Sequence, residues 1–459
     1  MRLAVVIMAA GMGTRMKSRL PKVLHPLLGK PMLTHILTAV QPINPAQIVV
    51  ITGHEADQVT ARLNSEPELA GLPLEFVLQS PQLGTGHAVQ QAQSALAAGG
   101  ADAVLVVYGD MPLLTTQTLQ QLLTAYQSGT GPLVMLTVTV DNPRGFGRVV
   151  RNDAGFVTAI VEEVDCTPQQ KAIRELNVGA YLFNARWLLK NLPNIPLSAK
   201  GEYYLTDLVG MAVAQGLPVQ AKQLADPLEA IGVNTRVHLA EAEHALRRRI
   251  NRRWMEAGVT LLDPATTYID STVQLGQDTV ILPNTHLRGQ TIIGQNCRIG
   301  PNSFVENSTI GDRCQIKFSV IENAVMEDDV DIGPFGHLRK GAHLASGVHM
   351  GNFGEVKNSY LGPGTKMGHF SYLGDATTGA DVNIGAGTIT CNYDGVNKHK
   401  TVIGDHTFIG SDTMLVAPLN IGAHAKTGAG SVVTRDVPDN SLVYGVPARP
   451  KKENSQTLE

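Results

Sequence analysis

The sequence predicts a chain in two parts: an α/β half built on a parallel sheet, followed by a parallel β-helix. Before residue 260, short apolar runs alternate with longer mixed segments, which is typical of strands and helices that alternate along a parallel sheet. After residue 260 the apolar pattern repeats every six residues, which is typical of a β-helix. The 46 glycines and the 5% of aromatic residues agree with this, because stacked coils need tight turns but no large rings.

Five apolar runs in the first half are predicted strands, and two segments between them are predicted helices. The strands are Leu3–Met8, Ile48–Thr52, Phe76–Leu78, Ala103–Tyr108 and Leu133–Val140, and the helices are Gly86–Ala98 and Thr115–Gln127. We expect helices on both faces of the sheet. Ligands of such sheets bind beyond the carboxyl ends of the strands, so the loops that directly follow apolar strands are the expected places for function.

One amphipathic helix is predicted to join the two parts. Over residues 236–258, apolar side chains recur at three- and four-residue steps and form one stripe: Leu239, Ala242, Leu246, Ile250 and Trp254. The predicted domains are residues 1–236, a linker helix over 237–257, and the β-helix domain over 258–459, which ends in a polar tail. Five arginines crowd the helix, which indicates a solvated face; a nucleic-acid-binding face is the alternative.

Aliphatic residues followed by glycine mark the six-residue repeat of the second half. In pairs such as Ile293-Gly294, Ile299-Gly300 and Ile409-Gly410, the aliphatic side chain is expected to point inward and the small residue to permit the turn. At about eighteen residues per coil, the segment predicts roughly ten coils. A 19-residue interval from Ile384 to Ile403 breaks the register. Its polar centre, TITCNYDGVNKHK, is predicted to be a loop ejected from the coil, where function tends to lie.

Charge and cysteine content exclude several classes of protein. A net charge of −3 gives no overall positive field that would hold nucleic acid or anionic lipid. The cysteines form no C-x-x-C pair, which argues against a structural zinc site or a secreted disulfide framework and favours the reducing cytoplasm. The apolar run at residues 3–10 is interpreted as a buried strand rather than a signal peptide, and no apolar stretch approaches the ~20 residues needed for membrane insertion.

The loop after the first predicted strand has the composition of a phosphate site. Small residues over 9–13 let backbone N–H groups approach a phosphate or a flat base, and Arg15 and Lys22 supply two cations close behind. A tight turn is the alternative, and the spacing is not that of a Walker A loop. Asp110 follows the strand Ala103–Tyr108, where a carboxylate can hold Mg²⁺ beside phosphates; a solvated loop aspartate is the alternative there.

These segments resemble the nucleotide-sugar pyrophosphorylases, and in particular the N-acetylglucosamine-1-phosphate uridylyltransferases. The resemblance rests on VIMAAGMGTRM with PKVLH and on QLGTGHA, YGD, GFGR, ELNVG, GEYYLTD and GVN, which occur in the family's order. It implies a Rossmann-like nucleotidyltransferase domain in which an oxygen of a sugar phosphate attacks the α-phosphorus of UTP and pyrophosphate leaves. Such a step needs positioning and charge neutralisation more than a covalent nucleophile.

The resemblance also implies a role for each matching residue of the first half. The uridine would be held by Met8, Ala9, Ala10, Gly11, Gln79, Gly84 and Thr85. Arg15 and Lys22 would contact the phosphates as catalytic cations. Tyr108, Gly109 and Asp110 would contact the nucleotide sugar, and Gly147, Glu162 and Asn177 would bind the acetamido sugar. Asp110 and Asn234 would bind Mg²⁺. Met8 stands where the family usually has leucine, which is a volume-conserving change.

The 14 histidines raise the possibility of a metal site in the second half. His337, His343 and His349 are six residues apart, so they are expected on successive faces of the prism and cannot converge on one ion within a chain. His406 and His424 are 18 residues apart and could stack on one face. Some hexapeptide-repeat proteins are zinc anhydrases that use histidines from two subunits, and this alternative stays open.

His369 lies in the first of two segments that resemble the acetyltransferase half of a bifunctional bacterial family. A lone histidine in a repeat is usually structural, although a neutral imidazole can accept a proton from an amine that attacks a thioester. The segments KMGHFSYLGD and NIGAGTITCNYDG resemble those of the glucosamine-1-phosphate N-acetyltransferase/N-acetylglucosamine-1-phosphate uridylyltransferases, whose repeats form a left-handed β-helix. By this resemblance His369 is the general base.

The same resemblance implies the other contacts of the second half. Arg339 and Lys357 would hold the substrate phosphate, and Tyr372 and Asn383 would position the amino sugar. The acetyl-CoA site would be lined by Ala386, Asn392, Tyr393, Ser411 and Ala429. His337 stands where the family often has a second arginine, and the family's C-terminal arginine has no clear match, Arg449 being the nearest candidate.

The predicted function is therefore two reactions that yield UDP-N-acetylglucosamine, a precursor of peptidoglycan and lipid A. Acetyl-CoA would acetylate glucosamine 1-phosphate on the β-helix, and the product would react with UTP in the first domain. The resemblance implies Mg²⁺ as cofactor and a cytoplasmic homotrimer whose acetyltransferase sites are shared between neighbours. One alternative is a nucleotidyltransferase with a single activity and a β-helix that only trimerises it. Another is a nucleic-acid-binding scaffold that uses the arginine-rich helix.

Overall fold

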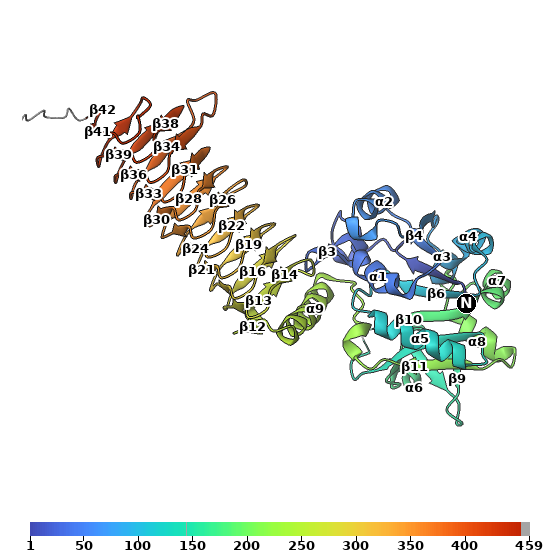
Figure 1. Ribbon diagram of the computed structural model, residues 1–459. Helices are drawn as coiled ribbons and strands as arrows, with labels where there is room; N and C mark the ends of the chain where they lie inside the picture. The colour runs from blue at the N-terminus through green and yellow to red at the C-terminus, as the bar shows by residue number, and fades with distance from the viewer. Residues whose placement is uncertain (144, 451–459) are drawn as a thin grey trace, which may run out of the picture. The chain divides into compact units, whose positions relative to one another are not determined.

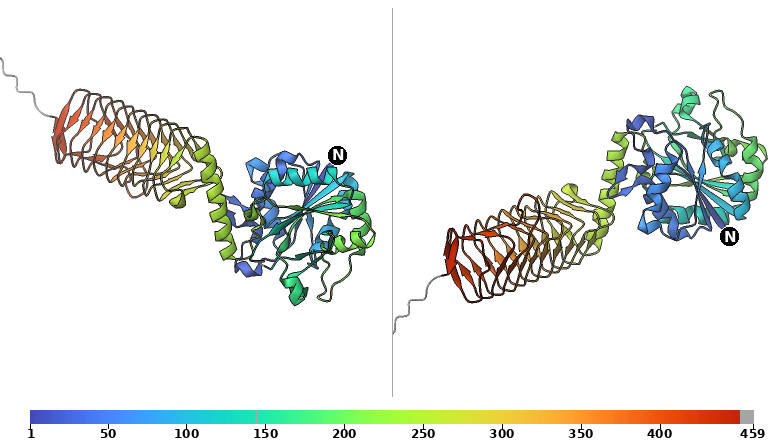
Figure 2. Two further views of the ribbon diagram at one scale, coloured as in Figure 1. Left: turned by 90° about the horizontal axis from the view of Figure 1, so that it is seen from below. Right: turned by 90° about the horizontal axis from the view of Figure 1, so that it is seen from above.

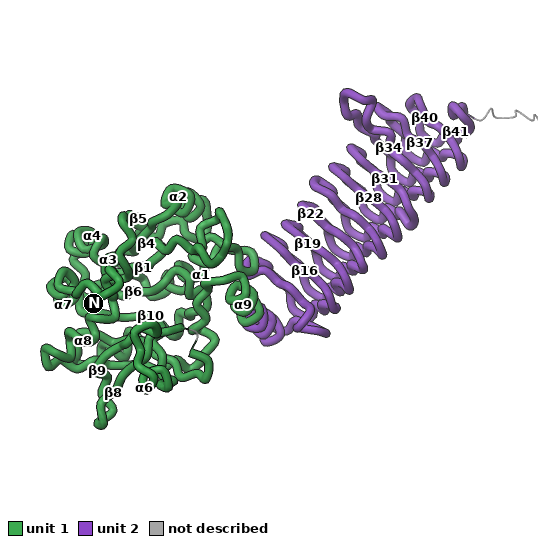
Figure 3. The backbone as a smooth tube through the Cα atoms, turned by 180° about the vertical axis from the view of Figure 1, so that it is seen from behind, with its two compact units in different colours: residues 1–246 green, residues 247–459 purple. Residues whose placement is uncertain are grey.

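The computed structural model describes residues 1–143 and 145–450, which form two compact units (Figure 3). Unit 1 is Met1–Leu246 and unit 2 is Arg247–Glu459. The boundary falls inside helix α9 (Arg236–Glu256), in the segment where the apolar stripe predicts a helix. The domain limits taken from the sequence stay a prediction, and the polar tail after Pro450 lies outside the described residues.

Unit 1 is built on a mixed sheet with the strand order β11-β7-β10-β6-β1-β4-β5 (Figure 1). The strands are β1 (Leu3–Met8), β4 (Gln47–Thr52), β5 (Leu74–Leu78), β6 (Ala103–Tyr108), β7 (Leu133–Thr139), β10 (Glu175–Asn184) and β11 (Val219–Gln223). Off this order, β8 (Arg148–Arg151) pairs with β10, and β9 (Val157–Val161) pairs with β8. The predicted parallel arrangement is confirmed for β1, β4, β5 and β6. The prediction missed β10, which runs antiparallel to both β6 and β7.

Helices cover both faces of this sheet, as predicted (Figure 2). Alternate residues of β1 point to opposite faces: Val5 and Ile7 pack in one apolar layer, and Ala4 and Val6 in the other. The first layer includes α1 (Met32–Val40), α2 (Ala56–Asn64) and α5 (Thr116–Ser128). The second includes α3 (Thr85–Gln91), α4 (Gln93–Gly99), α7 (Ala185–Asn191) and α8 (Asp207–Ala214). The helix predicted over Gly86–Ala98 is thus two helices that meet at Ala92.

Unit 2 is a left-handed parallel β-helix whose coils contribute in turn to three sheets, of 12, 10 and 9 strands (Figures 1 and 2). Its strands are short, from β12 (Thr260–Leu261) to β42 (Ala448–Pro450). One coil shows the pattern: β24 (Asp331–Ile332), β25 (His337–Leu338) and β26 (His343–Leu344) belong to different sheets, and β27 (His349–Met350) then pairs with β24. Asp331 aligns with His349, so this coil repeats after 18 residues, as the period predicts.

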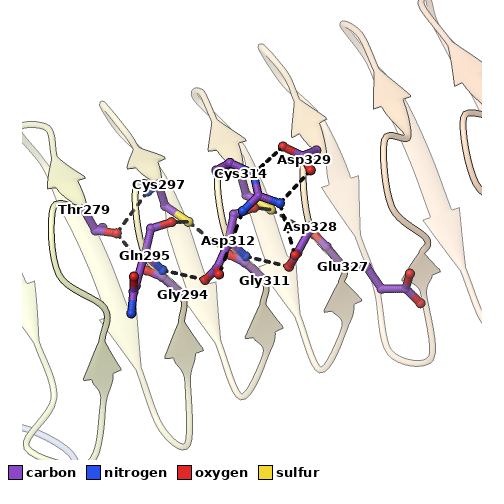
Figure 4. A network of polar contacts seen from close by, with 11 residues as sticks. Thr279, Gly294, Gln295, Cys297, Gly311, Asp312, Cys314, Glu327, Asp328 and Asp329 are labelled. Carbon is purple, nitrogen blue, oxygen red and sulfur yellow. Dashed lines mark hydrogen bonds and ion pairs between the residues drawn. The ribbon is translucent and has the colours of Figure 1, made fainter.

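The interior of the prism is filled by the aliphatic residues of the repeat, such as Ile293, Ile299 and Leu338, which are almost fully buried. Threonine or cysteine at one inward position also braces the turns. The Thr279 hydroxyl donates to the Gly294 carbonyl at 2.8 Å, and the thiols of Cys297 and Cys314 donate to carbonyls of the following coil at 3.1 and 3.0 Å (Figure 4). All four cysteines of the chain are free thiols, as expected for a protein without a disulfide framework.

The break in the six-residue register is a loop, as predicted. It leaves the prism between β34 (Ile389–Cys391) and β35 (Thr401–Ile403). An isolated antiparallel bridge joins Tyr393 to Lys398, so residues 393–398 form a small hairpin. Asp394 holds its tip, because its carboxylate accepts the N–H groups of Val396 and Asn397 and contacts His399 at 2.7 Å.

Candidate active sites

A cavity of about 550 Å³ lies in unit 1 beyond the carboxyl ends of β1, β5 and β6. This is the edge of the sheet at which the sequence places a ligand. Most of the residues predicted for the first site line it: Met8, Ala9, Ala10, Gly11, Arg15, Lys22, Gln79, Gly84, Thr85, Tyr108, Asp110, Glu162 and Asn234. The chain therefore brings together residues that are more than 200 positions apart in the sequence.

Two glycines at the cavity, one after β1 and one after β5, are required by close packing. Gly13 has a φ of 62°, and a Cβ there would lie 2.7 Å from the Cβ of Lys22. Gly84, with a φ of 98°, lies so close to the backbone of Tyr203 that a Cβ would come within 2.6 Å of its carbonyl oxygen. These two positions require glycine, and they place Lys22 and Thr85 at the cavity wall.

Cations and oxygen ligands meet at one point of the cavity. The Nζ of Lys22 lies 2.5 Å from Oδ2 of Asp110 and 3.1 Å from Oδ1 of Asn234, and Nη2 of Arg15 donates to the same Asn234 oxygen at 3.0 Å. Asp110 and Asn234 thus point their oxygens at a single positive charge. A carboxylate and an amide oxygen that converge in this way fit the ligand preference of Mg²⁺.

Two half-buried acidic groups with raised pKa values also line the cavity. Burial raises the pKa of Glu162, and the negative charges of Asp165, Asp207 and Glu202 add to the effect, although a 3.0 Å hydrogen bond from the Thr206 hydroxyl opposes it. Burial also raises the pKa of the Tyr108 phenol, so Tyr108 is a neutral donor. Both groups can bind the polar substituents of a sugar.

Gly109, Gly147 and Asn177 were also predicted to contact the substrate, but they are not among the residues that line this cavity. The Gly109 N–H donates to the Met8 carbonyl at 2.9 Å, which joins the ends of β6 and β1. The Asn177 amide is engaged within the protein, since it donates to the Tyr181 hydroxyl at 2.6 Å and accepts from the Gly179 N–H at 3.1 Å. The Gly147 carbonyl accepts from the N–H of Asn177. Substrate contacts of these three residues stay predictions.

In unit 2, three of the predicted residues lie on the outer face of the 10-stranded sheet. Tyr372 on β31 (Ser371–Gly374) aligns with Glu355 on β28 (Gly354–Lys357), and that strand ends at Lys357. Arg339 follows β25 and donates to Glu355 at 2.8 Å. The positive charges of Lys398 and Arg339 lower the pKa of Lys357, so three cations face one another here. Such a cluster suits a phosphate dianion.

His369 lies on one edge of the prism, between β30 (Lys366–Met367) of the 12-stranded sheet and β31 of the 10-stranded sheet. Ala386, Ser411 and Ala429 occupy the same edge in the next three coils. The ladder of backbone bonds shows this: Gly387 donates to Phe370 at 2.7 Å, Asp412 to Ala386 at 2.6 Å, and Gly430 to Ser411 at 2.8 Å. The predicted base and three of the predicted acetyl-CoA residues therefore form one column, in which His369, Ser411 and Ala429 are exposed.

The other predicted residues of this half are not brought to that column within one chain. Asn383 on β33 (Asn383–Ile384) belongs to the 12-stranded sheet. Asn392 and Tyr393 begin the ejected loop, on the edge between the 10- and 9-stranded sheets. Asn392 donates to Asp375 at 2.5 Å, and the Tyr393 hydroxyl donates to Gly395 at 2.6 Å. The set predicted for acetyl-CoA is thus divided between two edges of the prism.

The histidines of the repeat lie as the period predicts. His337, His343 and His349 belong to three different sheets, and each contacts an acidic side chain of the preceding coil: Glu322, Glu327 and Asp331. His406 and His424 stack with ring centroids 4.9 Å apart. Within residues 1–143 and 145–450, no three histidine, cysteine, aspartate or glutamate side chains are arranged to hold a metal ion.

Family models match both halves of the chain. Residues 5–192 match the MobA-like NTP transferase domain. Residues 272–307 match the bacterial transferase hexapeptide repeat, and residues 400–435 match the hexapeptide repeat of succinyl-transferase. None of the described helices is long and apolar enough to cross a membrane.

Curated relatives match the chain over nearly its whole length. Bifunctional protein GlmU of Stutzerimonas stutzeri is 49% identical over 447 residues, which cover 97% of this chain and 96% of the relative. Its counterpart in Heliobacterium modesticaldum is 47% identical over 450 residues, with 98% and 96% covered, and that of Trichlorobacter lovleyi is 49% identical over 441 residues, with 96% and 95% covered. The chain belongs to the bifunctional GlmU family.

Some residues that lie beside the predicted ones were given no role from the sequence. Gln82, Glu202 and Tyr204 line the cavity of unit 1, and Gln82 donates to the Ala10 carbonyl at 2.9 Å. The motifs QLGTGHA and GEYYLTD contain all three, so the resemblance marked their segments but not their contacts. Lys398 was missed because nothing in the sequence says that the ejected loop brings it beside Lys357.

Proposed function

We propose which residues carry the two activities of this bifunctional enzyme, an N-acetylglucosamine-1-phosphate uridylyltransferase and glucosamine-1-phosphate N-acetyltransferase. The uridylyl site is the cavity of unit 1, and the acetyl site is built on the outer surface of the β-helix. The observation that carries the first assignment is the convergence of Arg15, Lys22, Asp110 and Asn234 at the carboxyl end of the sheet.

In uridylyl transfer, the cavity positions the phosphate of N-acetylglucosamine 1-phosphate for in-line attack on the α-phosphorus of UTP. The glycine loop and Gln79 hold the uridine, and Glu162 and Tyr108 bind the sugar. Arg15 and Lys22 neutralise charge on the triphosphate as pyrophosphate leaves. Asp110 and Asn234 would hold Mg²⁺, which supplies further neutralisation of phosphate charge when it is bound. Lys22 then turns from Asp110 to a phosphate oxygen.

In acetyl transfer, the imidazole of His369 accepts the proton of the amine that attacks the thioester of acetyl-CoA. Arg339, Lys357 and Lys398 hold the phosphate of glucosamine 1-phosphate over the 10-stranded sheet, and Tyr372 positions the sugar. The column of Ala386, Ser411 and Ala429 gives a flat edge along which the pantetheine chain can run. Small side chains allow this close approach.

A homotrimer completes the acetyl site in this proposal. Asn383 and the pair Asn392–Tyr393 lie on other parts of the prism than His369, so a neighbouring copy supplies them. We place the enzyme in the cytoplasm, where acetyl-CoA and UTP are available and four free thiols remain reduced.

The proposal is tested by thiol release from acetyl-CoA when the full chain is mixed with glucosamine 1-phosphate in the absence of UTP. We expect release that depends on the amino sugar, and uridylyl transfer to N-acetylglucosamine 1-phosphate in a separate assay with Mg²⁺. Absence of thiol release from a chain that still transfers uridylyl groups would reduce the β-helix to a trimerising scaffold and contradict the assignment of His369.

A further inference from the structure

The two oxygen ligands proposed for Mg²⁺ come from two loop segments that lie side by side. Asp110 is in the segment between β6 and α5, and Asn234 follows the short 3₁₀-helix η7 (Pro227–Ala230). The Val233 N–H donates to the Asp110 carbonyl at 2.9 Å. A Cβ on Gly232 would lie 3.3 Å from Sδ of Met111, so the segments touch one residue further along. They run antiparallel, and neither is a strand in the sheet.

At the far end of this pair of segments, a buried carboxylate joins them. Glu229 is 5% exposed. Its Oε2 accepts from the N–H of Thr115 at 2.9 Å, and its Oε1 accepts from the hydroxyl of Thr118 at 2.9 Å. The Thr115 hydroxyl lies 3.2 Å from both oxygens. Thr115 is the N-cap of α5, so Glu229 is fixed to the end of a helix that packs in the core.

We propose that Glu229 is a positioning residue for uridylyl transfer, which holds Asn234 in register with Asp110 through the clamp on Thr115 and Thr118. The partners Val233–Asp110, Gly232–Met111 and Glu229–Thr115 are matched in antiparallel order, so a slip at Glu229 shifts Asn234 along Asp110. Such a shift would separate the two oxygens that now meet at Nζ of Lys22. On the other side of Asn234, Arg236 donates to the Met16 carbonyl at 3.3 Å, which leaves Asn234 between two anchors.

The clamp acts through shape and hydrogen bonding rather than through its charge on the metal. A threonine hydroxyl can donate or accept, so a glutamine at 229 can accept the Thr115 N–H and donate to the Thr118 hydroxyl. Glu229→Gln should therefore retain the clamp, whereas Glu229→Ala removes it and leaves the Thr115 N–H without its acceptor. If Glu229 acted by long-range charge, both substitutions would weaken metal binding alike.

The test rests on the proposed Mg²⁺ site and measures metal binding in two ways on the full-length enzyme. The first is the KM for Mg²⁺ in uridylyl transfer, and the second is the loss of the free Mn²⁺ spin-resonance signal in the presence of UDP-N-acetylglucosamine. For Glu229→Ala we expect the KM for Mg²⁺ to rise and the affinity for Mn²⁺ to fall, each by about tenfold, as is usual when a substitution disturbs the orientation of metal ligands. For Glu229→Gln we expect both to stay within about twofold of the unchanged enzyme.

One control variant separates this role from a general loss of stability. Asn184→Ala removes the cap of α7, which accepts the Trp187 N–H at 2.9 Å beside the opposite end of β6, so it should destabilise unit 1 without changing the KM for Mg²⁺. A lower kcat for Glu229→Ala with an unchanged KM and unchanged Mn²⁺ binding would overturn the proposal. Mn²⁺ binding that survives Asp110→Ala would instead contradict the proposed metal site itself.

Discussion

In unit 1 most of the predicted site residues line a single cavity, whereas in unit 2 they lie on two faces and two edges of a prism. The cause is geometric. The carboxyl ends of parallel strands meet at one edge of a sheet, so the loops that follow β1, β5 and β6 converge. The three faces of a β-helix point away from one another, so residues that are six apart diverge. One chain can therefore enclose the uridylyl site, but the acetyl site needs a second surface.

The largest effect is expected when the proposed base of the acetyl site, on the outer surface of the β-helix, is removed. We expect His369→Ala to lower acetyl transfer by about 10²–10⁴-fold, which is the contribution of a positioned proton acceptor. Uridylyl transfer should remain unchanged, since His369 is exposed and lies in the other unit. Both activities are measured on the same preparation. Loss of both would show that His369 holds the structure together instead.

A substitution at Arg15 tests the uridylyl site in the cavity of unit 1. Arg15→Ala removes the guanidinium that donates to Asn234, and we expect uridylyl transfer to fall by about 10²–10³-fold. Arg15 is exposed, so the stability of unit 1 should not change. Acetyl transfer serves as the internal control. A variant that retains near-normal uridylyl transfer would show that Arg15 has no role with the phosphates.

A third experiment tests whether neighbouring copies of the chain complete the acetyl site. His369→Ala and Asn383→Ala chains are co-expressed with different tags, and the mixed assemblies are purified. If each site takes its base from one copy and Asn383 from the next, about one in three sites of every mixed trimer carries neither substitution. Acetyl transfer should then return to about a third of normal, although each variant alone is inactive. Mixed assemblies without activity would place both residues in one chain's site.

The sequence predicts the interior of both halves well, because burial imposes a period. Strands such as Leu3–Met8 were bounded correctly, since a fully buried strand is a continuous apolar run. The strand β10 was not predicted, because Asn177 and Gly179 interrupt its apolar run. The break between α3 and α4 at Ala92 was also missed, since neither glycine nor proline marks it.

The candidate sites show a sharper limit. Residues named through motifs were found, but contacts made by flexible polar side chains, such as those of Lys398 and Gln82, were not. The division of the acetyl-CoA residues was open to prediction. Asn392 follows Ala386 by six residues, which moves it to the next edge of the prism, just as the same step separates the three histidines. The six-residue period alone was therefore sufficient to predict that these residues lie on two edges, but the residues were grouped by family resemblance instead.

The smallest expected effect is a change in the pH dependence of stability in unit 1. Because burial raises the pKa of Glu162 above its usual 4.5, the folded chain keeps this proton to a higher pH than the unfolded chain. The folded state then binds more protons between the two pKa values, so the free energy of unfolding falls as pH rises through that window.

Glu162→Gln removes the titration and retains an acceptor for the Thr206 hydroxyl. We expect the melting temperature of unit 1 to vary less with pH above 4.5 in Glu162→Gln than in the unchanged chain. The exposed Asp153, changed to asparagine, is the control. Curves for Glu162→Gln that run parallel to those of the unchanged chain would contradict this prediction, because they would show that folding does not change the titration of Glu162.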